Sequence, residues 1–266
     1  MNVAYVGYSE KMLEILLMQP RLKMSKIAYV PSRVNDRYLD IIKENNLEYF
    51  EVNTKDDIPK MKSFLEDVEI VIMYKFEFII PHYLLERSRF FNFHGGDLRT
   101  NRGAHAVVRS IINMDTETKL SLYELTGGID LGILVGEYVV NISSCDTTGS
   151  LNKKLQKGIP FLLEQLIMYI DGRKKGIVID EGKYYPKICA EDITINLEEH
   201  SLQKIDAILR SQLEYSGAIL PLDGMDKRIK KWTIKKNNRY EERKVELMEH
   251  CVKLSEGYLN LVMLFE

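Results

Sequence analysis

The fold is decided by the stretch MNVAYVGYSEKMLEILLMQPRLKMSKIAYV at residues 1–30. Val3–Val6 is a short apolar run that ends at Gly7, which predicts a buried strand. Ser9 is of a residue type that caps helices, and the apolar residues that follow at helical spacing are Met12, Leu13, Leu16 and Leu17. Ile27–Val30 is the next apolar run. This order of strand, helix and strand predicts two parallel strands joined by a helix.

The same alternation continues along the chain. Further strands are expected at Tyr49–Val52, Val68–Met73, Phe90–His94, Lys119–Leu125 and Ile133–Val140, and helices near 39–42, 58–65 and 104–113. Strands that alternate with helices of this length are typical of a sheet covered by helices on both faces. The sequence therefore predicts an α/β fold with a doubly wound, mostly parallel, Rossmann-like sheet.

A domain boundary is predicted near residue 175. A long helical stretch runs from Thr148 to Ile170; Pro160 should break it and Asp171-Gly172 should end it. One amphipathic helix then follows near 202–213. The last residues predict a small β element, with strands at Trp232–Ile234, Val252–Leu254 and Leu259–Leu264. We expect a catalytic domain at 1–175, and a C-terminal helix plus small β subdomain at 176–266.

Composition restricts the class of protein. The 266 residues carry a formal net charge of −2, which gives no global attraction to nucleic acid or anionic lipid. Cys145, Cys189 and Cys251 lie far apart, which argues against a disulfide framework or a metal site and favours a reducing compartment. The chain shows no signal-peptide pattern, and no uncharged apolar run approaches ~18 residues. We therefore expect a cytoplasmic protein without a membrane segment or a bound metal.

The glycines after the first strand argue against a dinucleotide site. Only Gly7 is present there, and neither the G-x-G-x-x-G pattern nor the P-loop pattern occurs. A pyrophosphate needs bare backbone at this turn, and the sequence does not provide it. A nicotinamide oxidoreductase is therefore disfavoured.

Three polar side chains are predicted to meet where two strands end. Asn92 and His94 share one face of the strand Phe90–His94, because side chains alternate along a strand. They stand at its carboxyl end, where open α/β sheets bind their ligands. Asp130 is flanked by glycines just after another strand, so it can reach a histidine on a neighbouring strand end.

These residue types suit acyl transfer to an amine. Asn92 can donate a hydrogen bond to a developing oxyanion, an interaction typically worth ~3 kcal/mol of barrier. An imidazole titrates near ~6.5, so His94 can take the proton that the attacking amine loses, and Asp130 can orient it. No nucleophilic serine or cysteine stands beside this group, which favours direct attack by the amine. The alternative is a purely structural strand-end histidine.

The motifs Asn92-x-His94, Arg102-Gly103 and Gly128-Ile129-Asp130-x-Gly132 resemble the signature of the folate-dependent formyltransferase family. That family includes methionyl-tRNA formyltransferase, glycinamide ribonucleotide transformylase and the sugar N-formyltransferases. The resemblance covers roughly Val68 to Ile170 and is looser before it. It departs from the family at Gly95-Gly96, where Pro-Ser is common, and at Leu131, where threonine is usual. These departures affect the acceptor more than the reaction.

The resemblance implies N10-formyltetrahydrofolate as the formyl donor, with the three roles given above for Asn92, His94 and Asp130. It also implies where the pterin of the donor binds. The residues expected there are Phe78, Ile79 and Ile80, together with the backbone of Thr126, Gly127 and Gly128.

The acceptor that we favour is a nucleotide-linked amino sugar. The β element after Pro221 is shorter than the RNA-binding barrel that tRNA formyltransferases add, whereas the sugar enzymes of the family resemble this layout. Many of those pair through their C-terminal parts, so a homodimer is expected. Tyr8, just past the first strand, and Arg102 are candidates for binding the acceptor. The alternative for Arg102 is a solvated loop arginine.

A basic run near the C-terminus keeps a second acceptor open. It comprises Lys227, Arg228, Lys230, Lys231, Lys235, Lys236, Arg239, Arg243 and Lys244. Such a run can contact RNA phosphates, which would suit methionyl-tRNA formylation, or the pyrophosphate of a nucleotide-linked sugar. It can also be the solvated face of a β ribbon. Formylation of another small amine, and a folate-like scaffold without catalysis, remain as further alternatives.

Overall fold

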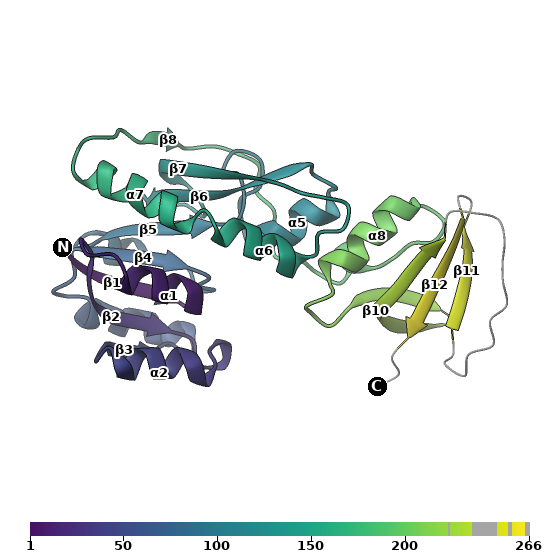
Figure 1. Cartoon of the computed structure of the whole chain (residues 1–266), viewed down its shortest axis with the longest axis horizontal. Coiled ribbons are helices and arrows are strands. Elements are labelled where there is room, and N and C mark those ends of the chain that lie inside the picture. The colour runs from purple at the N-terminus through teal and green to yellow at the C-terminus, as the bar shows by residue number, and fades with distance from the viewer. Residues whose placement is uncertain (223, 236–248, 255–256, 264–266) are drawn as a thin grey trace. The chain divides into compact units, whose positions relative to one another are not determined.

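The computed structural model describes residues 1–222, 224–235, 249–254 and 257–263 (Figure 1). The chain forms two compact units, and each is described by itself. Unit 1 comprises Met1–Ala104, Lys119–Val140 and Lys154–Tyr185. Unit 2 comprises His105–Thr118, Asn141–Lys153 and Pro186–Glu266. The division of the chain at residue 175 stays a prediction.

The sheet of unit 1 has the order β3-β2-β1-β4-β5-β6-β7-β8. Its strands are β1 (Asn2–Gly7), β2 (Lys23–Tyr29), β3 (Glu48–Glu51), β4 (Ile70–Tyr74), β5 (Arg89–His94), β6 (Glu117–Leu125), β7 (Gly132–Asn141) and β8 (Ile177–Ile179). Strands β3, β2, β1, β4 and β5 run parallel to one another. Strand β6 is antiparallel to β5, and β8 is antiparallel to β7. The predicted α/β fold with a mostly parallel sheet is confirmed.

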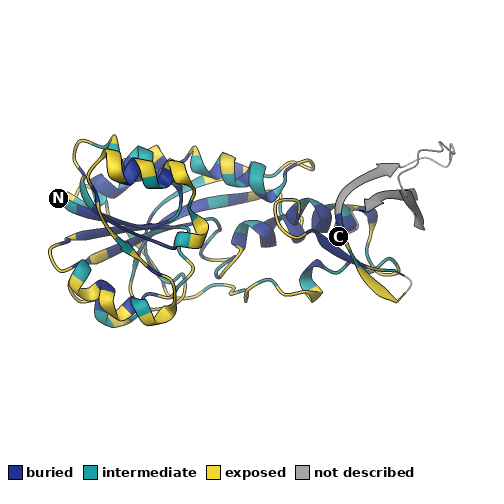
Figure 2. Ribbon diagram, turned by 90° about the horizontal axis from the view of Figure 1, so that it is seen from below, coloured by how far each residue is buried: buried dark blue, intermediate teal, exposed yellow. Residues whose placement is uncertain are grey.

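Helices cover both faces of this sheet (Figure 2). They are α1 (Glu10–Leu17), α2 (Asp36–Glu44), α3 (Met61–Phe64), α4 (His82–Leu85) and α7 (Ile159–Ile170), with 3-10 turns η1 (Pro31–Arg33) and η2 (Lys55–Lys60). Ser9 Oγ accepts a hydrogen bond from the Met12 amide at 3.4 Å, which confirms the predicted cap of α1. Helix α6 (Thr148–Gln156) ends before α7 begins, and Pro160 lies in the first turn of α7, as predicted.

The helix expected near 58–65 is shorter than its apolar pattern suggested. The structure has the 3-10 turn η2 there, followed by the four-residue α3. Pro59 lies inside η2 and has no amide hydrogen to donate, and Thr54 and Asp57 cap the turn.

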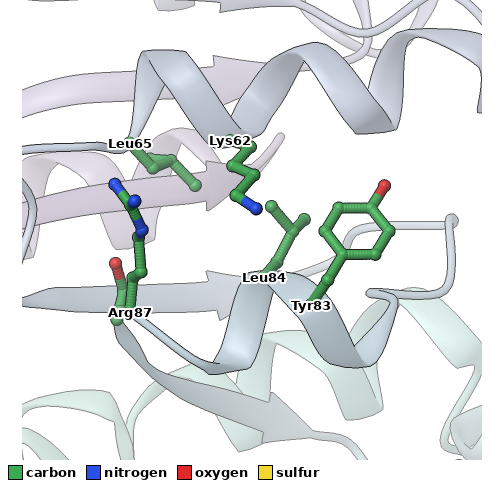
Figure 3. Close-up of a pocket in the computed structure, with 6 residues that line it drawn as sticks. Lys62, Leu65, Tyr83, Leu84 and Arg87 are labelled. Carbon is green, nitrogen blue, oxygen red and sulfur yellow. The ribbon is translucent and has the colours of Figure 1, made fainter.

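A cavity of about 10 Å3 lies beside α3 and α4 (Figure 3), which is room for one water at most. It is lined by Lys62, Leu65, Tyr83, Leu84, Arg87 and Ser88.

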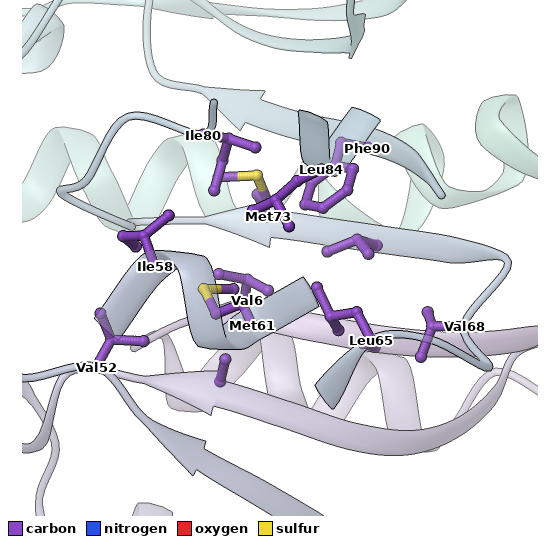
Figure 4. Packing of buried hydrophobic residues seen from close by; sticks show 13 residues of the cluster. Val6, Val52, Ile58, Met61, Leu65, Val68, Met73, Ile80, Leu84 and Phe90 are labelled. Atoms are coloured by element: carbon purple, nitrogen blue, oxygen red, sulfur yellow. The ribbon is translucent and has the colours of Figure 1, made fainter. Parts of the chain in front are cut away.

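One face of the sheet packs on these short helices (Figure 4). The buried residues of this cluster come from β1, β2, β4, β5, η2, α3 and α4 and the segments beside them. They are Ala4, Val6, Ala28, Val52, Ile58, Met61, Leu65, Val68, Val71, Met73, Ile80, Leu84 and Phe90. The cluster includes Met73 near the end of β4 and Phe90 near the start of β5, so apolar packing holds both strands on this face of the sheet.

Unit 2 has its own core and its own sheet. Helices α5 (Ala106–Ile112) and α8 (Leu202–Ser211), with the turn η3 (Glu191–Ile193), pack on apolar residues of β9 and β10. The antiparallel sheet has the order β11-β12-β10-β9, with β9 (Ala218–Leu222), β10 (Met225–Lys235), β11 (Glu249–Leu254) and β12 (Gly257–Met263). Val252 pairs with Leu259, so the predicted hairpin is confirmed, although its turn residues 255–256 lie outside the described residues.

Candidate active site

Strand β5 presents two polar side chains at its carboxyl end. Phe91 and Phe93 are only 0% and 2% exposed, while Asn92 is half-buried and His94 is buried on the opposite face. Asp130 lies in the loop between β6 and β7, with φ of 49°, a left-handed conformation that is uncommon for a residue other than glycine. The structure brings all three predicted side chains to one place in unit 1.

The His94 imidazole is fixed by one hydrogen bond and faces a carboxylate with its other ring nitrogen. Nε2 lies 2.8 Å from the Asn101 carbonyl oxygen, which can only accept, so Nε2 carries the hydrogen of that bond. Nδ1 lies 3.6 Å from Asp130 Oδ2. The ring is therefore oriented with Nδ1 as the nitrogen that exchanges its proton, and the Asp130 carboxylate stands where it stabilises the charge of a protonated ring.

The Asp130 carboxylate is itself fixed by two donors. The Gly103 amide donates to Oδ2 at 2.7 Å, and the Tyr123 hydroxyl donates to Oδ1 at 2.8 Å. Each carboxylate oxygen thus has a defined partner, which sets the angle that Asp130 presents to His94.

Tyr123 is a residue that the motif analysis missed. Its hydroxyl accepts a hydrogen bond from Asn92 Nδ2 at 3.0 Å while it donates to Asp130, so it joins the two side chains. Burial, followed by the nearby Asp130 charge, raises the pKa of Tyr123 well above its ordinary value and keeps the phenol protonated. The sequence could indicate Tyr123 only if the pairing of β5 with β6 were known, because Tyr123 lies directly opposite Asn92 in that register.

The two segments predicted to bind the donor lie close to one another. A Cβ built on Gly127 would stand 3.5 Å from Cδ2 of His82, the first residue of α4, and residues 78–80 immediately precede that helix. Ile79 is 73% exposed and Thr126, Gly127 and Gly128 are exposed, whereas Ile80 is buried and Phe78 is half-buried. An exposed apolar side chain beside bare glycine backbone fits a flat heteroaromatic ring.

Tyr8 lines a cavity of about 220 Å3 at the carboxyl ends of β1 and β2. Its other lining residues are Glu10, Ser32, Arg33, Val34, Asn35 and Tyr38. Burial raises the pKa of the Tyr8 phenol, so this group enters the cavity as a neutral donor. The cavity is large enough for part of a polar small molecule.

Arg102 has a different environment from the one expected of a substrate arginine. Its guanidinium donates to the carbonyl oxygens of Ile129, at 3.2 Å, and Gly182. Its own backbone pairs with Lys183 and Tyr185. These contacts hold the loop around Asp130, and a role in acceptor binding stays a prediction.

The described part of the chain has neither a metal-binding cluster nor a membrane-spanning helix. Within residues 1–222, 224–235, 249–254 and 257–263, no group of three or more His, Cys, Asp or Glu residues is arranged to hold a metal ion. Among the same residues, no helix has the length and apolar character needed to cross a membrane.

No protein-family model matches the chain. Among curated proteins, it is similar to the methionyl-tRNA formyltransferases of Protochlamydia amoebophila (29% identity over 185 residues) and Lactobacillus johnsonii (32% over 147 residues). The predicted resemblance to the formyltransferases is confirmed. These matches cover 67% and 54% of this chain but 58% and 46% of those proteins, so the chain spans about half the length of the curated formyltransferases it matches.

Solved structures extend the likeness to formyltransferases at the level of the fold. HypX from Aquifex aeolicus, in complex with tetrahydrofolic acid, matches with a TM-score of 0.70 and 15% identity, over 97% of this chain and 43% of that one. The sugar 3N-formyl transferase WlaRD, with dTDP and 5-N-formyl-THF, matches with a TM-score of 0.69 and 17% identity, over 100% and 98%. A 4-N formyltransferase from Francisella tularensis matches with a TM-score of 0.68 and 18% identity, over 85% and 94%.

Proposed function

We propose that this chain is an N-formyltransferase that moves a formyl group from N10-formyltetrahydrofolate to the amine of a nucleotide-linked amino sugar. The observation that carries the proposal is the connected group of Asn92, Tyr123, Asp130 and His94 at the carboxyl end of the sheet. It combines an amide donor, an oriented imidazole and a fixed carboxylate, which acyl transfer to an amine requires.

Each residue has one task in the reaction. The donor supplies an activated formyl group on nitrogen when it is bound. The Asn92 amide has two hydrogens, of which one is used by Tyr123, so the other is available to the formyl oxygen as negative charge develops there. His94 Nδ1 takes the proton that the amine loses when its nitrogen bonds to the formyl carbon, and Asp130 stabilises the charged ring. The same proton then goes to the departing donor nitrogen, so His94 ends the cycle unchanged.

The donor segments fit this order of events. Residues 78–80 and 126–128 lie together and expose both an isoleucine side chain and glycine backbone. The glycine loop leads directly to Asp130 at the C-terminal end of the same segment. A ring held on this loop therefore places its formyl group toward the carboxyl end of β5.

The extent of the matches favours a sugar acceptor. A sugar 3N-formyl transferase matches over 100% of this chain and 98% of its own length, whereas the methionyl-tRNA formyltransferases are matched over about half of theirs. The cavity of about 220 Å3 beside Tyr8 is where we propose that the acceptor binds. A cytoplasmic homodimer, as expected from the sequence, is part of the same proposal.

Formylation of methionyl-tRNA is the second candidate function. The curated relatives carry that name, which is the observation in its favour. Four residues of the basic run that would contact RNA, Lys236, Arg239, Arg243 and Lys244, lie outside the described residues. The side chains of Lys230, Lys231 and Lys235 are not described either. If this candidate is right, neutralising Lys230, Lys231, Lys235 and Lys236 weakens a salt-sensitive binding of tRNA.

The deciding experiment is a panel of acceptors. Purified protein is incubated with N10-formyltetrahydrofolate and a set of amino-sugar nucleotides, and, in parallel, with charged methionyl-tRNA. We expect formylation of at least one sugar nucleotide, with His94→Ala inactive as the control for background transfer. If tRNA is formylated and no sugar nucleotide is, the second function replaces the first. If wild-type protein formylates neither kind of acceptor, both proposed functions are wrong.

A further inference from the structure

Lys75 is the residue that follows β4, and its backbone is strained. Its φ is 56°, in the left-handed region that residues other than glycine, asparagine and aspartate rarely adopt. Strain of this kind persists only where the surrounding structure imposes it, and it gathers at functional sites. The surrounding structure therefore imposes the conformation of Lys75.

The strand register places Lys75 between two site residues. Tyr74 pairs with Gly7 of β1 on one side and with Phe93 of β5 on the other. The residues that follow these three are Tyr8, Lys75 and His94. Lys75 thus stands on the same edge of the sheet, between the residue that lines the 220 Å3 cavity and the proposed proton acceptor.

The ammonium group of Lys75 lacks an anionic partner. The side chain is half-buried, with Nζ 5.6 Å from the centre of the Tyr74 ring, and within residues 1–222 no carboxylate pairs with it. Burial lowers the pKa of Lys75 from its ordinary value, and no opposing charge restores it. Glu77, two residues on, is bound by Arg33 at 2.7 Å instead.

Three other buried or half-buried lysines among the described residues each have a polar partner. Lys26 is bound by Asp67, Lys119 by Asp97 at 2.8 Å, and Lys204 donates to the Ile112 carbonyl at 2.7 Å. Withdrawing a cation from water without such a partner is unfavourable. Lys75 is thus the exception among these four lysines, and it lies at the site.

We propose that Lys75 binds a phosphate group of the nucleotide-linked acceptor, at the edge between the Tyr8 cavity and His94. The inference rests on the proposed function for the identity of the ligand. A phosphate oxygen supplies the missing charge, and an ammonium group is a common partner for it. Binding there positions the sugar side of the acceptor toward His94, so Lys75 selects acceptors that carry a phosphate.

The test is direct binding of UDP and dTDP to the 266-residue chain, measured by isothermal titration calorimetry. Lys75→Met keeps the apolar stem and removes the charge, and we expect it to weaken the binding of the diphosphates about tenfold. Lys62→Met is the matched control, because Lys62 also lies over a tyrosine ring, that of Tyr83 at 5.9 Å, but lines a cavity of about 10 Å3 that has no room for a ligand (Figure 3). We expect it to bind like the wild type.

A second variant separates binding from folding. Lys75→Gly also removes the ammonium, but glycine adopts a φ of 56° without strain, so its melting temperature should equal or exceed that of the wild type. Weak diphosphate binding by this well-folded variant supports the inference. Equal binding by wild type, Lys75→Met and Lys75→Gly overturns it, as does a wild type that binds neither diphosphate.

Two further outcomes distinguish this inference from the proposed function. If the variants lose affinity for the folate donor and keep that for the diphosphates, Lys75 serves the donor carboxylates and the inference is wrong. If no acceptor is formylated but UDP or dTDP still binds in a Lys75-dependent way, the phosphate site stands and the proposed function falls.

Discussion

The Tyr123 hydroxyl lies 2.8 Å from Asp130 Oδ1 and 3.0 Å from Asn92 Nδ2. One phenol therefore connects Asn92, the proposed hydrogen-bond donor to the oxyanion, with the carboxylate that faces His94. Because the phenol gives its only hydrogen to Asp130, its oxygen must accept from Asn92. This fixes which end of the Asn92 amide is the nitrogen and leaves an N–H for the substrate.

Tyr123→Phe is expected to lower kcat about tenfold to a hundredfold while changing the KM of either substrate little, because two positioning hydrogen bonds are lost and the ring is kept. Steady-state kinetics measure both constants. Tyr169→Phe is the matched control, since the Tyr169 hydroxyl also donates to a carboxylate, Glu124 Oε2 at 2.8 Å, but outside this group. Similar losses in the two variants would show that Tyr123 has no special part in the site.

Asp130→Asn is expected to lower the rate at least about a hundredfold without unfolding the protein. Asparagine has one acceptor oxygen in place of two, so it loses the hydrogen bond from either Gly103 or Tyr123, and the neutral group no longer stabilises a charged imidazole. The rate is measured with saturating substrates, and the fold by circular dichroism. Asp171→Asn, at a carboxylate bound by Arg21 and Arg173, serves as the control; unchanged turnover in Asp130→Asn would remove this residue from proton handling.

Acid should destabilise unit 2 through Asp192. The hydrogen bond from Arg109 lowers the pKa of this carboxyl from an ordinary 3.8 to about 2. Its stabilising contribution is therefore complete above pH 4 and is lost as the pH falls through about 2; allowing for partial solvent screening, it amounts to roughly 1 kcal/mol. Urea unfolding of wild type and Asp192→Asn should differ at pH 6 and converge near pH 2. A constant difference at all pH values would contradict this origin.

Gly132→Ala should destabilise unit 1 severely, with a cost of several kcal/mol estimated from backbone overlap and strain. Gly132 has φ of 154°, and a Cβ there would lie 1.9 Å from the Glu124 carbonyl oxygen. Gly172→Ala is the control, because its φ of 72° is also unfavourable for alanine but nothing stands within 4 Å of the added carbon. Its cost should be about 1 kcal/mol. Thermal unfolding compares the two, and equal losses would rule out the overlap.

Local patterns predicted the elements that depend on local interactions. The spacing of Met12, Leu13 and Leu16 and the cap at Ser9 sufficed for α1, because both act within a few residues. The alternation in β5 likewise placed Asn92 and His94 on one face. The helix expected at 58–65 is only partly present, because a 3-10 turn that tolerates Pro59 takes its first residues and the α-helix covers only Met61–Phe64.

The sequence did not predict features that depend on pairing between distant segments. Tyr123 joins the site only through the antiparallel register of β6 with β5, and no spacing in the sequence encodes that register. The strain and half-burial of Lys75 follow from the ends of β1, β4 and β5 lying side by side. Arg102 was considered for the acceptor because it is a charged loop residue, but its partners are peptide carbonyls that only the folded loop assembles.

The anchor of His94 on the Asn101 carbonyl has a genetic consequence. A peptide oxygen is present whatever amino acid a codon specifies, so point mutations at position 101 leave that atom in the chain. An insertion or deletion that reroutes the loop moves that oxygen away from the imidazole. The orientation of the imidazole is therefore sensitive to the length of this loop, and also to side-chain size at position 101, where the asparagine is buried.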